Sequence, residues 1–203
     1  MLKRTGGINI LKPCFFITLI LFTFLVGQTL AQTSYHYVTV TQGPNGVITP
    51  QGTAGIVTVQ DGGSRKFTLT PKLHYHVEDV FVDGPSVKDS LQWDGKIAYY
   101  TLANVTVDHE ITAAFSIDTP TLTVSKVGTG SGVISGTGID CGPDCENSYD
   151  WGTPLELTAT PDPGSIFRGW FVAGTLVSKN PARTITVTGN KKITAKLDRK
   201  SVV

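Results

Sequence analysis

The chain alternates apolar and polar residues over short runs. Phe67 and Leu69 fall on one face of such a run, and Leu155, Leu157 and Ala159 fall on one face of another. A period of two is typical of a β-strand with one buried side. Glycine and proline separate the runs at short intervals, and no window has a helical period. The pattern predicts an all-β or β-rich fold of short strands joined by tight turns.

The order of these runs occurs twice along the chain. Residues 67–71, FTLTP, match residues 157–161, LTATP, and residues 80–84, VFVDG, match residues 170–174, WFVAG, with no gap between the blocks. A repeat at constant offset predicts a duplication. We divide the chain into a signal peptide at 1–31, a first β-rich repeat at 35–116, a linker at 117–121, and a second β-rich repeat with a disulfide hairpin at 122–198.

The matching runs exchange large and small residues. Leu69 and Val80 stand in the first repeat where Ala159 and Trp170 stand in the second, and all four are expected to point inward. Such an exchange is expected where core volume is conserved while the sequence diverges. It indicates that this stretch has a packing role.

The N-terminus has the features of a secretory signal peptide. Lys3, Arg4 and Lys12 precede an apolar run, Cys14–Val26, and small residues precede a cleavage site after Ala31. The alternative is an uncleaved anchor helix, but the run is shorter than the roughly 18–20 residues that a bilayer span needs. We expect a secreted protein, extracellular or periplasmic, with no membrane segment after cleavage.

The charge balance excludes one class of partner. The N-terminal segment holds three of the 17 Lys and Arg residues and none of the 16 Asp and Glu residues, so the exported chain has a net charge of −2. No basic excess favours nucleic acid. The expected partner is an extracellular protein or a glycan.

Two cysteines remain after cleavage, Cys141 and Cys145. An even pair in an exported chain is expected to form a disulfide. Gly142 and Pro143 favour a tight reversal between them. The predicted bridge closes a short loop and is expected to fix a hairpin tip.

Two tryptophans are candidates for ligand contact. Trp170 occupies an inward strand position, whereas Trp93 lies in a polar stretch and Trp151 lies beside a turn glycine. Exposed aromatic side chains mark binding surfaces. Trp93 and Trp151 are therefore the possible ligand contacts.

Two groups of residues have metal-binding side chains, but neither has the pattern of a metal site. His74 and His76 are fewer than the ligands of a zinc site, and the acidic residues around the cysteines fit no calcium-loop spacing. We interpret the first group as a polar turn and the second as a solvated acidic hairpin, and leave open whether the latter binds calcium. No metal site and no cofactor are predicted. The residues concerned are His74, His76, Asp79 and Asp83 in the first group and Asp140, Asp144, Glu146 and Asp150 in the second.

No catalytic arrangement is recognisable. All four histidines fall in the first repeat, no nucleophile-elbow motif surrounds a serine, and the cysteine spacing is CxxxC instead of the redox spacing CxxC. We predict that the protein is not an enzyme.

The ordered motifs resemble a known family. The opening strand with its Asn-Gly turn, the Thr-Pro and Gly-Trp elements, and the closing Ile-Thr-Ala strand are similar to the divergent internalin B-type repeat, also called the bacterial repeat domain. The first repeat departs from this pattern, because Asp79-Val80 replaces Gly-Trp and His74 replaces a glycine.

The resemblance implies two tandem copies of a small β-grasp-like or β-sandwich-like unit on a secreted or surface-exposed bacterial protein. It implies no catalytic residues. We therefore expect a structural or adhesive extracellular module, with a small glycan- or matrix-binding protein as the alternative.

Overall fold

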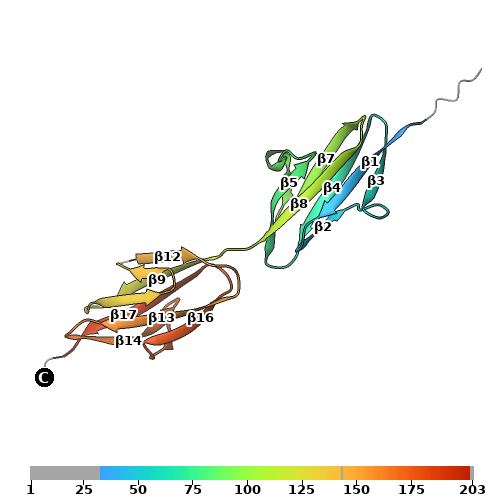
Figure 1. Cartoon of the computed structure of the whole chain (residues 1–203). Helices are drawn as coiled ribbons and strands as arrows, with labels where there is room; N and C mark the ends of the chain where they lie inside the picture. Colours follow the sequence, from blue (N-terminus) through green and yellow to red (C-terminus); the bar gives the residue numbers. More distant parts are fainter. Residues whose placement is uncertain (1–32, 143, 202–203) are drawn as a thin grey trace, which may run out of the picture. The chain divides into compact units, whose positions relative to one another are not determined.

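The computed structural model describes residues 33–142 and 144–201, which fold almost entirely into strands (Figure 1). The predicted signal peptide at residues 1–31 lies outside the described residues. Among the described residues, no helix is long and apolar enough to span a membrane. The elements up to Ile117 are β1 (Tyr35–Gln42), β2 (Gly46–Thr49), β3 (Ile56–Gln60), β4 (Gly63–Pro71), β5 (Tyr75–Val82), the 3-10 turn η1 (Lys88–Ser90), β6 (Gln92–Asp94), β7 (Ile97–Val105) and β8 (His109–Ile117).

These elements form a two-layer structure, which we call the first sandwich. One sheet has the order β3-β1-β8-β5 and the other β2-β4-β7-β6. Strands β1 and β2 are joined by the predicted Asn-Gly turn, and Asn45 has a φ of 69°, the left-handed region that such turns require.

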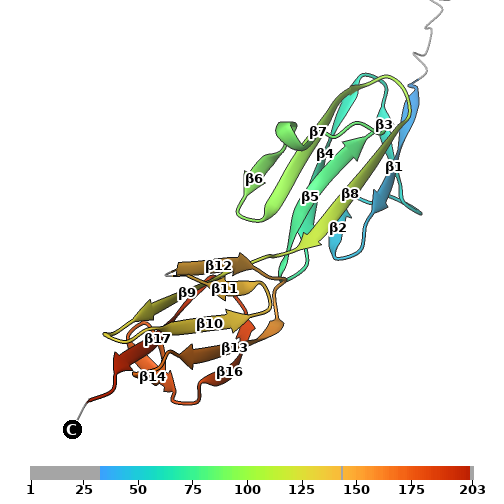
Figure 2. The same ribbon diagram turned by 60° about the vertical axis from the view of Figure 1, so that its left-hand side comes forward.

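The first and last strands of this sandwich are neighbours. Strands β1 and β8 run parallel, with Val38 opposite His109 and Gln42 opposite Ala113, and Figure 2 displays them side by side. Parallel neighbours point the same way, so the chain enters at one end of the sandwich and leaves at the other.

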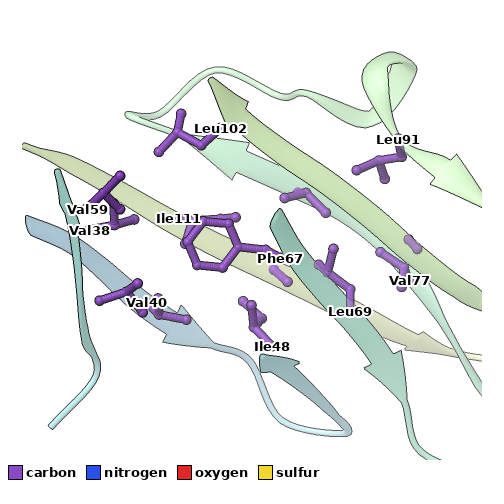
Figure 3. Close-up of a cluster of buried hydrophobic side chains, with 14 of the residues drawn as sticks. Val38, Val40, Ile48, Val59, Phe67, Leu69, Val77, Leu91, Leu102 and Ile111 are labelled. Carbon is purple, nitrogen blue, oxygen red and sulfur yellow. The ribbon is translucent and has the colours of Figure 1, made fainter. Parts of the chain in front are cut away.

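The core of the first sandwich lies between its two sheets. Phe67 and Leu69 are fully buried, as their alternation predicted, and Val80 is buried opposite them. Figure 3 displays the Phe67 ring among Ile111 and other aliphatic side chains. Burial of one such side chain contributes roughly 1.5–3 kcal/mol.

The remaining elements form a second sandwich. Its sheets have the orders β11-β10-β13-β16 and β12-β9-β17-β14-β15. The strands are β9 (Thr121–Val127), β10 (Gly132–Gly136), β11 (Ile139–Cys141), β12 (Asp144–Ser148), β13 (Thr153–Pro161), β14 (Ser165–Val172), β15 (Thr175–Ser178), β16 (Ala182–Val187) and β17 (Lys191–Arg199).

The second sandwich repeats the pairing of terminal strands. Strand β9 runs parallel to β17, with Leu122 opposite Lys191 and Val127 opposite Lys196. The orders β3-β1-β8-β5 and β12-β9-β17-β14 place elements of the two sandwiches in the same relative positions. The β-rich fold class is thus confirmed. Of the two predicted forms, β-grasp-like and β-sandwich-like, the structure has the sandwich, because the one helical element among the described residues is the short 3-10 turn η1.

Trp170 is the centre of the second core. It is fully buried, its Nε1 donates a hydrogen bond to the carbonyl of Pro181 at 3.2 Å, and the Phe167 ring meets it edge-on at 5.4 Å. Leu157 and Ala159 on β13 are buried with it. The inward position that the sequence predicted for Trp170 is confirmed.

The disulfide joins the two sheets of the second sandwich. Cys141 and Cys145 are bonded, with their Cα atoms 5.2 Å apart. Cys141 pairs with Ile134 in one sheet, whereas Cys145 pairs with Val124 in the other. The expectation of a hairpin tip was therefore wrong. Alternation predicts strands but not their sheet, and here the chain crosses between sheets at the bridge.

Replacement of Trp170 with alanine should destabilise the protein by about 3–5 kcal/mol, because it leaves a cavity in the second core. Denaturant unfolding measures the change. Trp93→Ala is the matched control, since Trp93 is 49% exposed and its loss should cost well under that amount. Equal costs for the two variants would contradict the assigned core.

Replacement of Cys141 and Cys145 with serine should cost about 2 kcal/mol, the loop-entropy value for so short a closed loop. The loss should be local, because the bridge holds β11 and β12 alone. Hydrogen exchange resolved by peptide is the measurement. Faster exchange in β11 and β12, with unchanged exchange in β1 to β8, is expected; uniform acceleration in both sandwiches would refute the local role.

Candidate functional site

Trp151 is half-buried and stacks against a histidine. The ring centroids of Trp151 and His74 are 3.4 Å apart and the rings are inclined by 11°. His74 has a φ of 67° in the tight turn before β5. His74 stands where the repeat pattern has a glycine. It keeps the left-handed backbone conformation and adds a ring that covers one face of Trp151.

The short connection between β8 and β9 is hydrogen-bonded at both ends. The amide of Asp118 donates to the carbonyl of His74 at 2.8 Å, and the amide of Trp151 donates to the carbonyl of Asp118 at 2.9 Å. The amide of Tyr149 donates to Pro120 at 3.1 Å. All of these residues lie in the one compact unit that begins at Thr33.

The Asp118 carboxylate is the charged centre of this region. It pairs with the Lys96 ammonium and, at 3.3 Å, with Nδ1 of His76. Burial by itself would raise the Asp118 pKa, but the hydrogen bonds and positive charges of Lys96 and His76 outweigh burial and hold the pKa below its ordinary value.

A shallow groove of about 500 Å³ runs over these residues. This volume lies within the usual range of small-molecule sites. The groove combines one aromatic wall with charged and amide groups, a mixture that can stack on the apolar face of a sugar ring and bond its hydroxyls. Its lining includes His74, Lys96, Asp118, Trp151 and Asn190. We call it the junction groove.

Trp93, the other candidate aromatic, lies outside the junction groove. It stands on the three-residue strand β6, opposite Ala98 of β7, and is 49% exposed. The structure therefore separates the two tryptophans that the sequence grouped as possible ligand contacts. Trp93 lies on the edge strand β6, whereas Trp151 is stacked against His74.

In the first metal hypothesis, His76 and Asp83 bond to different partners. His76 bonds Asp118 and Glu78, and Asp83 bonds Nδ1 of His109 at 2.6 Å. Burial would raise the Asp83 pKa, but the amide of Glu110 and the His109 ring lower it on balance. Within residues 33–142 and 144–201, no three His, Cys, Asp or Glu side chains are grouped to hold a metal ion.

Sequence reasoning missed the histidine–carboxylate pairs. His36 bonds Asp61 at 2.8 Å across 25 residues, and the pair of His109 and Asp83 spans a similar distance in sequence. Each histidine lies near a strand end and contacts a turn. No spacing in the sequence indicates such partners, because strand register determines them.

The comparisons with solved structures give low similarity. The Bacillus anthracis TIE protein is 6% identical, with 82% of this chain and 34% of that chain covered and a TM-score of 0.34. The major pilin T-13 of Streptococcus pyogenes is 11% identical, with 83% and 98% covered and a TM-score of 0.30. The pilus-presented adhesin Cpa is 12% identical, with 54% and 33% covered and a TM-score of 0.26. This chain spans about a third of the TIE protein and of the adhesin. At these scores the likenesses carry no argument about function.

The comparisons of sequence are more specific. The search of curated proteins finds no match. The family model described as the divergent InlB B-repeat domain matches residues 122–201, and this match does not extend to the predicted first copy. The match begins in β9 and runs through β17, so the second sandwich is similar to the divergent InlB B-repeat domain over its whole length.

Proposed function

We propose that the protein is an extracellular structural module that transmits tension between its two ends. The observation that carries this proposal is the parallel pairing of first and last strands in each sandwich, β1 with β8 and β9 with β17. An adhesive or spacer protein outside the cell is loaded through its chain ends, so the strands at those ends bear the load.

The direction of the applied force determines how strongly a parallel strand pair resists separation. When parallel neighbours are pulled from opposite ends, their interstrand hydrogen bonds lie across the direction of sliding and must break together. When both are pulled from the same end, the bonds open one at a time. Resistance to force is set by the rate of unfolding, and the first geometry has the higher barrier because more bonds are lost at once.

The connection between the sandwiches suits the same role. Asp118 is bonded to His74 and to Trp151 through backbone atoms, and its side chain pairs with Lys96. A short connection with satisfied hydrogen bonds has little freedom to lengthen before a sandwich opens. Tension would therefore pass directly from β8 to β9.

The proposal includes a non-enzymatic role outside the cytoplasm. In the described chain, the side-chain hydrogen bonds of the histidines go to carboxylates and none goes to a serine, threonine or cysteine. A serine or cysteine nucleophile needs a base within hydrogen-bond reach. Secretion rests on the sequence features of residues 1–31, and the family of the second sandwich supports a surface or secreted setting.

A second candidate function is glycan or matrix binding. The junction groove favours it, because Trp151 provides an aromatic wall beside Lys96, Asp118 and Asn190. Trp93 supplies a separate exposed aromatic on β6. This function and the load-bearing one are compatible, since a tether also needs an attachment point.

Single-molecule pulling through the two chain ends should give two high-force events, one for each sandwich. Each should lengthen the chain by roughly 250 Å at about 3.4 Å per residue. The control attaches the handles at Ser34 and Asp108, which lie at the same end of the β1–β8 pair. The first sandwich should then open at a clearly lower force. Equal forces in the two geometries would refute the load-bearing pair.

Binding to a glycan array should distinguish the second candidate function. We expect Trp151→Ala to abolish any binding that uses the junction groove, because it removes the stacking wall. Trp93→Ala should leave that binding unchanged and serves as the matched control. If wild-type protein binds and neither variant loses binding, the aromatic residues are not the contact.

A further inference from the structure

The two sandwiches differ in charge. Residues 33–117 hold five Lys and Arg residues and eight Asp and Glu residues, a net charge of −3. Residues 121–203 hold nine and seven, a net charge of +2. The small net charge of the whole chain is therefore the sum of an acidic first sandwich and a basic second sandwich.

The acidic half has an aromatic surface on the outer face of β1. Tyr35 and Tyr37 are 54% and 53% exposed, because they alternate with the buried Val38 and Val40. Glu110 of β8 lies opposite Thr39 on the same face, and the Asp108 carboxylate accepts the amide hydrogen of Tyr37 at 2.8 Å. We call this the acidic face; its members are Tyr35, Tyr37, Asp108 and Glu110, with Ile56 of β3 beside them.

The corresponding sheet of the second sandwich has the opposite character. On β17, Lys192 and Lys196 alternate with the buried Ile193 and Ala195 and point outward. Apolar side chains lie beside them, because Thr194 is paired with Phe171 and Phe171 is paired with Leu176. We call this the basic face; its members are Lys192, Lys196, Phe171 and the 42% exposed Leu176.

The two faces occupy the same position in their sandwiches. Glu110 follows the start of β8 by one residue, and Lys192 follows the start of β17 by one residue. Both side chains are exposed, so neither face is covered by the other within one copy. The exposed charges at this position, Glu110 and Lys192, have opposite signs, and each lies beside apolar area; on the second sandwich, Glu146 of β12 shares the outer face across β9 from Lys192. Charges of opposite sign beside apolar area are typical of an interface that excludes water around a charged pair.

We propose that the acidic face of one copy docks on the basic face of a second copy of this chain. The contact is heterologous, since a different surface is used on each partner, and such contacts continue from copy to copy unless a ring closes. The aromatic anchors are Tyr35 and Tyr37, a residue type that dominates the energy of interfaces. The contact would join copies of the proposed structural module sideways or end to end. The argument for the contact does not depend on the proposed load-bearing function.

Sedimentation velocity of the purified exported chain tests the proposal. At low salt, the average mass should rise with concentration above that of the monomer. At high salt, where charges more than a few ångström apart are screened, the mass should return to that of the monomer. A monomer at every concentration in low salt overturns the proposal.

Charge reversal makes the test specific. Glu110→Lys and Lys192→Glu should each weaken the association about tenfold or more, since each places like charges in contact. The double variant Glu110→Lys/Lys192→Glu should restore it, because the pair is then complementary with its signs exchanged. Loss without restoration in the double variant overturns the assigned pairing.

Two further variants control for net charge. Asp94→Lys changes an exposed carboxylate on β6, and Lys179→Glu changes an exposed lysine between β15 and β16. They alter the total charge as the test variants do, but lie outside both faces. They should associate like the wild type. An equal loss in these controls would mean that net charge alone sets the association, which also overturns the proposal.

Discussion

The pairing of the first strand with the last is the interaction on which each sandwich depends. Val38 and Val40 of β1 and Ile111 and Ala113 of β8 are all buried, so separation of these strands opens the core directly. The pairing also joins residues far apart in sequence, such as Val38 and His109. Contacts of this kind close long loops and are typical of slow-folding topologies. The pair therefore closes the sandwich.

The sequence predicts the local structure well, because burial follows alternation. Phe67, Leu157 and Trp170 are all fully buried, and the period of two identifies them without further information. The Asn-Gly turn is equally local, since positive φ at Asn45 requires one of a few residue types. These features depend on neighbours within a few residues, and a single sequence contains that information.

The sequence does not predict which strands pair with each other. Alternation assigns a side chain to a face but does not say which strand lies next to it, so the parallel pairs and the crossing of the disulfide between sheets could not be derived. The stack of His74 on Trp151 joins residues that are 77 positions apart in the sequence, and no motif indicates it. The inward-facing Arg183, directly opposite Leu157 on β13, likewise breaks the expected pattern of apolar side chains facing the core.

The two sandwiches share an order of strands but differ in how they are secured. The second has a large central tryptophan and a disulfide between its sheets. The first has neither, and histidine–carboxylate pairs connect its turns to its strand ends instead. These differences lie outside the parallel terminal pair, which is present in both. We expect this combination if the terminal strand pair is essential to each sandwich, because the other stabilising contacts can then diverge.

Native-state hydrogen exchange of the β1–β8 and β9–β17 amides tests the central claim most directly. If these pairs close the sandwiches, their amides should exchange only through global unfolding of the sandwich that contains them, with the highest free energy of opening in that sandwich. Exchange of these amides through a local opening, at a lower free energy than the amides of β4 or β13, would contradict the claim.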